Sequence, residues 1–295
     1  LVIEIFVLKR RFSFTIYLGL VLALLGASII FFGSSLPLFT QIIWQIFSIL
    51  TRLKRLNNKS RILRKNFIKN GYADLGKISK SDLLKLKNLI NPNFEKNNKP
   101  LKTLPRKNNE ILAKEINKFL KKFNYEISSI FGSDFQSFII DIQKTTPSEF
   151  IDKDSSFAWH YDDEPSQMIK LFLYLNDTTK QNGAFRTFNR TISRNLFLKK
   201  FISNTKEDRI KSQKLVNNKI ENQCSWIERN EGSVFCFNNS LIHKATYPIK
   251  GERTIISIML YPSFKQITLD NIKKSLSMDL LNSQFPDNPW RNPYK

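Results

Sequence analysis

Apolar residues recur along this chain with spacings that predict different elements in its different parts. Residues 12–32 carry no charge and are rich in Leu, Ile, Phe and Ala, and such a run is long enough to cross a bilayer as a helix. A turn over residues 33–37 separates it from a second apolar stretch, residues 38–50, which is too short to span comfortably. Residues 1–50 are therefore predicted to be a membrane anchor, either one span or a helical hairpin. A buried pair of helices docked on the following domain is the alternative.

Further along, the apolar residues fall at helical spacing. Ser79, followed by an acid three residues later, is a helix start, and Asn91-Pro92 ends the predicted helix. Residues 109–131 are predicted to form one long amphipathic helix that Gly132 closes.

After residue 132 the pattern changes to the alternation of β-strands. A basic stretch over residues 193–223, with apolar residues at helical spacing, interrupts it and is predicted to be a helical insertion. Strands are predicted over 135–144, 157–162, 168–175, 184–188, 233–238, 241–245 and 253–260. This order predicts an α+β, mainly β domain over residues 71–270, a double-stranded β-helix (jelly roll) braced by helices, followed by a C-terminal tail over 271–295.

The charge is strongly positive, with a formal net charge of +22. Residues 51–70 hold eight basic residues and no acidic one, which is typical of a juxtamembrane segment that attracts anionic lipid and marks the cytoplasmic side. A hairpin anchor places both basic flanks in the cytoplasm. Because the other basic residues are spread along the chain, no nucleic-acid partner is expected. Two cysteines are too few for a disulfide framework, so a reducing compartment is the simpler assumption.

The chain has only two histidines, and both lie in the β-rich part. His160 precedes Asp162 by two residues, so in an extended segment both side chains point to one face. His243 lies 81 residues after Asp162. Two imidazoles with one carboxylate are the facial triad that holds non-haem Fe(II) with open coordination positions. The alternative is a surface histidine that happens to lie beside an acid. Alternation sends the rival acid Asp163 to the opposite face.

The residues His160-x-Asp162, then His243, then Arg253 ten residues later, resemble the Fe(II)/2-oxoglutarate-dependent dioxygenases, in particular the phytanoyl-CoA dioxygenase-like branch. The likeness covers residues 67–265. It is supported by three stretches: 70–75, 170–177 and 182–185. Residues 188–193 depart from the Gly-Ser-His motif that the family often has there, so the likeness says little about the substrate.

The resemblance implies Fe(II) as metal, 2-oxoglutarate as co-substrate and O2 as oxidant. It also implies that Arg253 binds the distal carboxylate of 2-oxoglutarate, for which a fixed guanidinium is suited. The alternative for Arg253 is a solvated arginine at a strand end.

Other residues of the predicted strands are candidates for the pocket. Lys170 shares a strand face with Tyr174 and would be a buried cation that contacts the co-substrate, or an edge lysine that faces water. Thr246 offers a hydroxyl near the distal end of the co-substrate. Gln143 and Tyr174 are expected to line the substrate side.

The function predicted from these features is that of a membrane-anchored dioxygenase with its catalytic domain facing the cytoplasm. It would hydroxylate a lipid or another small organic substrate. Two alternatives stay open: a non-catalytic jelly-roll binding module tethered to the membrane, and a basic adaptor for membrane surfaces or nucleic acid.

Overall fold

The structure, a computed structural model, describes most of the chain after residue 57. The described residues are 58–94, 99–105, 109–148, 156–162, 168–203, 205–263 and 265–278. The predicted membrane anchor over residues 1–50 lies outside this set, as do residues 51–57 and 279–295. Among the described residues, no helix combines the length and the apolarity that crossing a bilayer requires.

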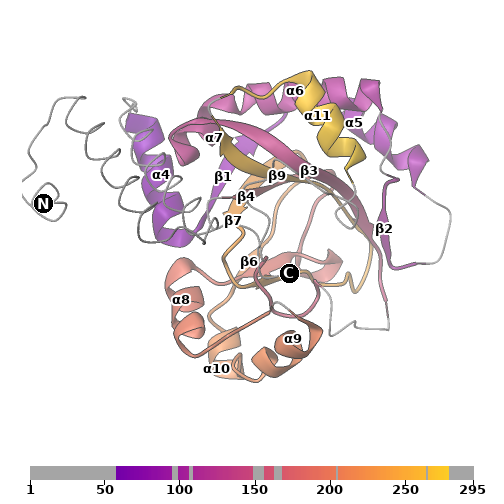
Figure 1. Cartoon of the computed structure of the whole chain (residues 1–295). Coiled ribbons are helices and arrows are strands. Elements are labelled where there is room, and N and C mark those ends of the chain that lie inside the picture. The colour runs from indigo at the N-terminus through magenta and orange to yellow at the C-terminus, as the bar shows by residue number, and fades with distance from the viewer. Residues whose placement is uncertain are drawn as a thin grey trace, which may run out of the picture. The chain divides into compact units, whose positions relative to one another are not determined.

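Two antiparallel sheets form the framework (Figure 1). The larger sheet has the strand order β1-β7-β4-β9-β3-β2, and the smaller has the order β6-β5-β8. The strands are β1 (Tyr72–Lys77), β2 (Leu101–Thr103), β3 (Asp134–Thr145), β4 (Ile169–Tyr174), β5 (Phe185–Thr187), β6 (Ser225–Ile227), β7 (Ser233–Asn238), β8 (His243–Lys244) and β9 (Arg253–Ser263). Two facing antiparallel sheets agree with the predicted jelly-roll class.

Helices cover the outer face of the larger sheet, and a second group lies beside the smaller sheet (Figure 1). The first group is α4 (Asn58–Asn70), α5 (Lys80–Ile90), α6 (Glu110–Lys122), α7 (Asn124–Phe131) and α11 (Leu269–Ser277). The second group is α8 (Arg190–Leu198), α9 (Lys206–Gln213) and α10 (Asn218–Glu221), and most of it falls within residues 193–223. Short 3-10 turns are η1 (Asn91–Asn93) and η2 (Lys180–Asn182).

The caps of the first helices follow the sequence signals. The Ser79 side chain accepts a hydrogen bond from the backbone N–H of Asp82 at the start of α5, which confirms that helix start. Gly132, at φ +77°, closes α7 in the left-handed conformation that favours glycine. The single helix predicted over 109–131 is wrong, because the backbone of the buried Phe123 leaves the helical region (φ −100°, ψ 11°) and separates α6 from α7.

The strand predicted over residues 157–162 is also wrong. Only one residue of it, His160, forms a bridge, and its partner is His243. The neighbouring backbone N–H groups bond side chains of the helical insertion instead: Trp159 donates to Gln213 and Tyr161 donates to Ser203. Those side-chain acceptors replace the ladder that a regular strand would need.

The folded domain extends beyond both predicted boundaries. α4 precedes residue 71 and packs against α7 through the buried Ser60, whose hydroxyl donates to Tyr125 at 2.5 Å. α11 continues past residue 270 and packs on β3, with Ile272 and Leu276 buried.

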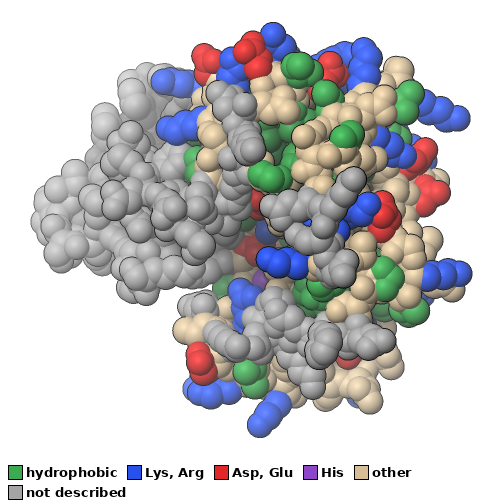
Figure 2. Space-filling model, turned by 90° about the vertical axis from the view of Figure 1, so that its right-hand side faces the viewer, with side chains coloured by type: hydrophobic (Ala, Val, Ile, Leu, Met, Phe, Trp, Pro, Cys, Tyr) green, Lys and Arg blue, Asp and Glu red, His purple; other side chains and the backbone are tan. Residues whose placement is uncertain are grey.

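The larger sheet separates two cores. Its outer face packs on the helices through residues such as Ile142, Leu173 and Ile256. Its inner face is rich in aromatic side chains, among them Phe172 and Phe235, and packs against the smaller sheet. Lys and Arg side chains are scattered over the described face that Figure 2 shows and do not gather in one patch.

Candidate metal centre

His160 and His243 lie beside each other because their backbones form an antiparallel bridge. The N–H of His160 donates to the carbonyl of His243 at 2.9 Å, and the N–H of His243 donates to the carbonyl of His160 at 2.7 Å. The two ring centroids are 4.3 Å apart. Residues 83 positions apart are thus fixed side by side by main-chain bonds that do not depend on a ligand.

Both imidazoles are oriented in the same way. The Nδ1 of His160 lies 2.8 Å from the carbonyl of Ala158, and the Nδ1 of His243 lies 2.7 Å from the carbonyl of Leu241. A carbonyl only accepts, so each Nδ1 carries the proton and each Nε2 keeps a free lone pair. A hydrogen bond from the outer ring nitrogen to a carbonyl fixes the tautomer and orientation of a metal-binding histidine in this way.

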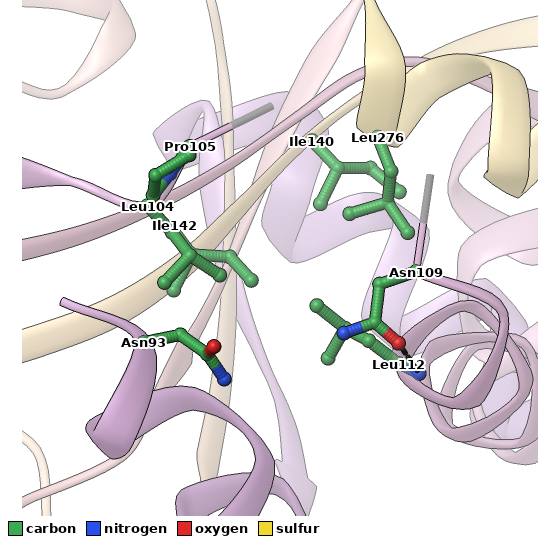
Figure 3. A pocket seen from close by; sticks show the side chains of 8 residues that line it. All are labelled: Asn93, Leu104, Pro105, Asn109, Leu112, Ile140, Ile142 and Leu276. Atoms are coloured by element: carbon green, nitrogen blue, oxygen red, sulfur yellow. Dashed lines mark hydrogen bonds between the residues drawn. The ribbon is translucent and has the colours of Figure 1, made fainter. Parts of the chain in front are cut away.

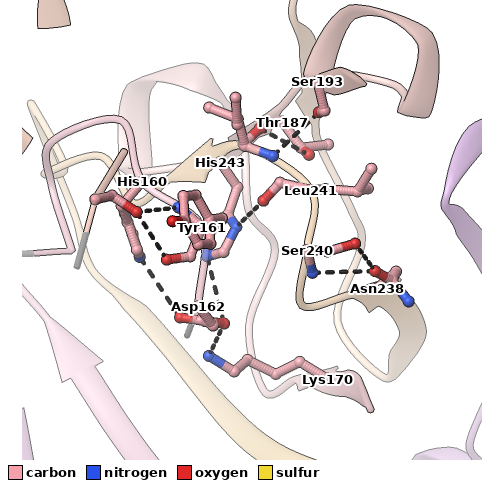
Figure 4. Close-up of polar contacts among 12 residues, drawn as sticks. His160, Tyr161, Asp162, Lys170, Thr187, Ser193, Asn238, Ser240, Leu241 and His243 are labelled. Atoms are coloured by element: carbon pink, nitrogen blue, oxygen red, sulfur yellow. Dashed lines mark hydrogen bonds and ion pairs between the residues drawn. The ribbon is translucent and has the colours of Figure 1, made fainter. Parts of the chain in front are cut away.

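Asp162 completes the cluster, as the sequence predicted (Figure 4). Its backbone N–H donates to the carbonyl of Asn239 at 3.1 Å, which holds the residue next to the bridge. Its Oδ1 lies 3.7 Å from His160 Nε2, and its Oδ2 lies 3.6 Å from His243 Nε2. One ligand atom from each of the three residues falls within 4.8 Å of the others.

The fourth member of the cluster is Lys170, which comes from the inner face of β4. Its Nζ donates to Asp162 Oδ2 at 2.5 Å, and both side chains are mostly buried. The structure therefore places Lys170 against a predicted metal ligand. Its predicted contact with the co-substrate stays a prediction.

Burial decides the charge of these groups. It lowers the pKa of His160 to about 3, assisted by the neighbouring His243, and it also lowers the pKa of His243. Burial by itself would raise the pKa of Asp162, but Lys170 and the two imidazoles outweigh it and hold that pKa well below its usual range. At neutral pH the cluster is two neutral imidazoles, one carboxylate and one ammonium.

This donor set fits a divalent first-row metal. A bound ion needs neutral imidazole lone pairs and an ionised carboxylate, and the cluster provides these without a proton having to leave. Ligand bonds of about 2 Å require donor atoms about 3 Å apart on one face, which the observed 3.6–3.7 Å separations approach. Two histidines and one carboxylate leave coordination positions open for other ligands.

The wall beside the cluster is aromatic. The His243 ring lies 5.0 Å from the Phe237 ring and 5.3 Å from the Phe185 ring, measured between centroids. On the outer side, Trp159 stacks on Phe188 at 4.4 Å and so packs the segment that carries His160. An apolar wall of this kind excludes water from the ligand atoms.

Arg253, at the start of β9, is 4% exposed. Its Nη1 donates to the carbonyl of Gly183 at 2.5 Å, and its Nη2 donates to Thr145 Oγ1 at 3.3 Å. Its buried Nε has no hydrogen-bond partner, and no carboxylate pairs with it among the described residues. Burial lowers the pKa of Arg253 to about 10, so it is charged at neutral pH. Arg253 is thus a buried cation with one N–H donor unused. The alternative of a solvated arginine at a strand end is wrong.

Strand register brings the two predicted substrate-side residues close to Arg253. Gln143 on β3 and Tyr174 on β4 both lie directly opposite Ile255 of β9. Ile255 is two residues after Arg253 on the same strand, and Arg253 itself lies opposite Thr145. The Tyr174 hydroxyl is buried without a hydrogen-bond partner. Two buried donors without acceptors therefore lie on the same sheet face.

Thr246 lies at the same turn. Its hydroxyl donates to the carbonyl of Ala184 at 2.7 Å, next to the Gly183 carbonyl that binds Arg253. A side chain at Gly183 would come within 2.8 Å of the Thr246 carbonyl oxygen, and Gly183 has φ +91°, so the close approach requires glycine. Thr246 therefore helps to shape the turn around Arg253, and its contact with a co-substrate stays a prediction.

Some residues that build the site were not identified from the sequence. These are Ala158 and Leu241, whose carbonyls orient the imidazoles, and Gly183 and Thr145, which hold Arg253. Each orienting carbonyl comes two residues before its histidine. Main-chain carbonyls of this kind leave no signal in a side-chain pattern, and the contact of the Thr145 hydroxyl depends on the pairing of β3 with β9.

Two hollows lie apart from the triad residues. A cavity of about 120 Å³ opens among helices on the outer face of the larger sheet (Figure 3). Ile140 and Ile142 in its wall belong to the core between that face and the helices. A larger hollow, of about 680 Å³, is lined by residues that include Phe157, Lys244 and Thr246.

No family model matches this sequence, and no curated protein is significantly similar to it. Among solved structures the chain is similar to EvdMO1, with a TM-score of 0.50 and 13% identity over 69% of this chain and 50% of that one. It is also similar to the non-heme alpha ketoglutarate dependent epimerase SnoN from nogalamycin biosynthesis (TM-score 0.49, 10% identity, 69% of this chain and 83% of that one). A third is HygX from Streptomyces hygroscopicus with nickel, 2-oxoglutarate and hygromycin B bound (TM-score 0.48, 12% identity, 72% of this chain and 89% of that one).

The likeness to EvdMO1, at a TM-score of 0.50, concerns the fold over 69% of this chain. The printed name of EvdMO1 gives no activity, so it distinguishes neither the superfamily that the motifs resemble nor its phytanoyl-CoA dioxygenase-like branch. At such low identity the likeness concerns the fold, so the chemistry has to be argued from the side chains of the site.

Proposed function

We propose that the protein is an Fe(II)- and 2-oxoglutarate-dependent oxygenase that hydroxylates a small organic substrate. The observation that carries this proposal is the buried cluster of His160, Asp162 and His243, with both Nε2 atoms unprotonated and turned toward the carboxylate. When bound, iron with 2-oxoglutarate and O2 would supply the oxidising power, and the protein supplies ligand geometry and a dry pocket.

Arg253 supports the choice of co-substrate. A buried guanidinium with an unused donor is stabilised by an anion that can accept several hydrogen bonds, as a carboxylate does. The Tyr174 hydroxyl offers a further donor next to it. A dicarboxylate could therefore bind the metal at one end and Arg253 at the other.

The reaction outcome is proposed as hydroxylation because all three ligand positions are filled by protein side chains, including the carboxylate of Asp162. SnoN is named an epimerase and SnoK a carbocyclase, so hydroxylation is the outcome proposed here and not one that these names supply. HygX was crystallised with hygromycin B, a small molecule. A small organic molecule, lipid or otherwise, is accordingly the substrate class that we propose here.

The direct test is an anaerobic titration of the protein with Fe(II), with and without 2-oxoglutarate, followed by succinate measurement after oxygen is admitted. The native chain should bind one equivalent of Fe(II), show a metal-to-ligand absorption band only with 2-oxoglutarate, and release succinate. The Asp162→Ala variant should lose all three signals, whereas the matched Asp270→Ala variant, at an exposed position in α11, should keep them.

A native chain that neither binds iron nor gains thermal stability from it would refute the enzyme proposal. It would favour the non-catalytic binding module in its place. Salt-sensitive binding to lipid or nucleic acid that survives loss of both histidines would favour the adaptor.

We propose in addition that residues 12–32, alone or with 38–50, anchor the protein in a membrane with its domain in the cytoplasm. The outer face of α4 supports this, because the exposed Arg61, Lys65 and Lys69 lie along one side of the helix with no acidic residue in it. Ile62 and Ile68 flank these cations and are 62% and 50% exposed. A basic face with apolar edges suits the anionic surface of a cytoplasmic leaflet.

Carbonate extraction of cell membranes tests the anchor. The native chain should stay in the membrane pellet, and a chain with Leu22→Arg and Leu24→Arg should be extracted. Protease added to intact cells should leave the domain uncut if it faces the cytoplasm. Extraction of the native chain, or cleavage of the domain in intact cells, would contradict the respective part of this proposal.

A further inference from the structure

Lys170 has an unusual position for a residue with a full positive charge. It projects from the inner face of β4, directly between Phe237 of β7 and Met259 of β9 in the strand register. Its ammonium is 2.5 Å from Oδ2 of Asp162, the carboxylate of the proposed metal site. The carboxylate thus has a cation on one oxygen before any metal arrives.

A divalent ion on His160, His243 and Asp162 would come close to that ammonium. With metal–ligand bonds of about 2 Å, an ion on the carboxylate would lie roughly 4 to 5 Å from Lys170 Nζ. A charge of +1 and a charge of +2 at that distance repel strongly in a partly dehydrated site. This repulsion acts against the benefit of holding Asp162 in place, which is typically about 10- to 100-fold in metal affinity for a residue that hydrogen-bonds a metal ligand.

The charges of the cluster show when the repulsion is relieved. Asp162, Lys170 and the two neutral imidazoles sum to zero, and a divalent metal raises the sum to +2. The carboxylate of 2-oxoglutarate at the metal lowers the sum to +1, and its distal carboxylate neutralises the separate cation Arg253. Metal and co-substrate should therefore favour each other's binding by the same factor, as linkage requires.

We propose that Lys170 competes electrostatically with the metal for Asp162. The site then binds a divalent ion weakly by itself and tightly only together with a dianionic co-substrate. Lys170 is a positioning residue that makes loading of the centre depend on 2-oxoglutarate. This inference rests on the proposed metal site and adds a regulatory property to it.

The test is calorimetric titration of the full-length protein with Co(II) or Mn(II), each with and without 2-oxoglutarate. Three variants at one position separate charge from hydrogen bonding. Lys170→Met removes both, Lys170→Gln keeps a hydrogen bond to Asp162 without the charge, and Lys170→Arg keeps the charge. The neutral variants should bind the metal alone at least tenfold more tightly than the native chain, and the factor by which 2-oxoglutarate improves metal binding should shrink to match. The arginine variant should behave like the native chain.

Thermal unfolding gives a second readout that a purely structural role would not move in this way. Without metal, Lys170→Met should melt at a lower temperature than the native chain, because Asp162 loses its ion-pair partner. With metal, the rise in melting temperature should be larger in the variant than in the native chain.

The two proposals fail in different ways. A native chain that binds neither Co(II) nor Mn(II) would refute the metal site itself. If the native chain binds the metal, and Lys170→Met and Lys170→Gln bind it equally or more weakly, the competition is refuted and the metal site stands. Should Lys170→Met not fold, the glutamine variant decides the question.

Discussion

Replacing Arg253 by Met separates the two roles that a buried arginine can have. If Arg253 serves to bind an anion, the substitution should abolish co-substrate binding and leave the fold almost unchanged. If Arg253 serves to hold the fold together, the substitution should destabilise the fold and leave the co-substrate affinity of the folded protein unchanged. The side chain of Met has a similar length and no charge, so it fills the space without a cavity.

The structure gives the magnitude. Burial lowers the pKa of Arg253 from 12.5 to about 10, and at about 1.4 kcal/mol per pKa unit the buried charge costs about 3 kcal/mol. The hydrogen bonds to Gly183 and Thr145 return a similar amount, at about 1.5 to 3 kcal/mol for a good bond to a charged group. These contributions nearly cancel, so the free energy of unfolding of the metal-free Arg253→Met protein should change by less than about 1 kcal/mol.

In co-substrate binding, no opposing contribution offsets the loss of the Arg253 guanidinium. Loss of a buried guanidinium that pairs with a carboxylate costs about 2 to 5 kcal/mol. The dissociation constant of 2-oxoglutarate, measured by calorimetry in the presence of Mn(II), should therefore rise at least about 30-fold.

Arg186→Met is the matched control. Arg186 pairs with Glu221 at 2.6 Å and stacks over Trp226 at 4.4 Å, on the opposite side of β5 from the aromatic core. Its loss should lower the melting temperature and leave 2-oxoglutarate affinity unchanged. If Arg253→Met unfolds the protein while the affinity of the remaining folded fraction is native, Arg253 is structural and the assignment of the co-substrate site is wrong.

Further predictions concern other parts of the same architecture. Tyr174→Phe should weaken 2-oxoglutarate binding about 5- to 30-fold by calorimetry, because one buried donor is lost, and native affinity would exclude the hydroxyl from the site. Gly183→Ala should destabilise the protein by about 1 to 3 kcal/mol in urea unfolding, since φ is +91° and the new Cβ meets the Thr246 carbonyl; an unchanged midpoint would contradict this. Ser79→Ala should cost about 1 kcal/mol through the lost cap on Asp82 and leave metal affinity native, so a change in metal binding would refute its purely local role. Removal of the metal with a chelator should lower the melting temperature of the loaded protein, and this shift should be absent from an Asp162→Ala protein.

Local features could be predicted from the sequence because their causes lie within a few residues. Ser79 and Gly132 act on backbone groups up to four residues away, and alternation along β3 and β9 is a property of each strand. The order His160, Asp162, His243 and Arg253 likewise suffices to indicate the donor set, because the chemistry of a facial triad depends on residue type.

Where local patterns were wrong, distant groups had decided the structure. Residues 157–162 alternate like a strand, but their N–H groups find acceptors in Gln213 and Ser203 of the insertion. The predicted long helix divides at the buried Phe123, although nothing in its apolar spacing marks a break there. In both cases local periodicity cannot indicate which distant groups share a contact.

The sequence by itself determined which ligands this protein can offer, since imidazole, carboxylate and guanidinium chemistry belongs to the residues. Only the tertiary structure decided their charge and availability. The ammonium of Lys170 lies on Asp162, and Arg253 is buried with a donor unused, because strands far apart in the chain pair in one register. Burial and proximity arise from that pairing, and they turn a set of ordinary side chains into a site that should bind a metal together with an anion.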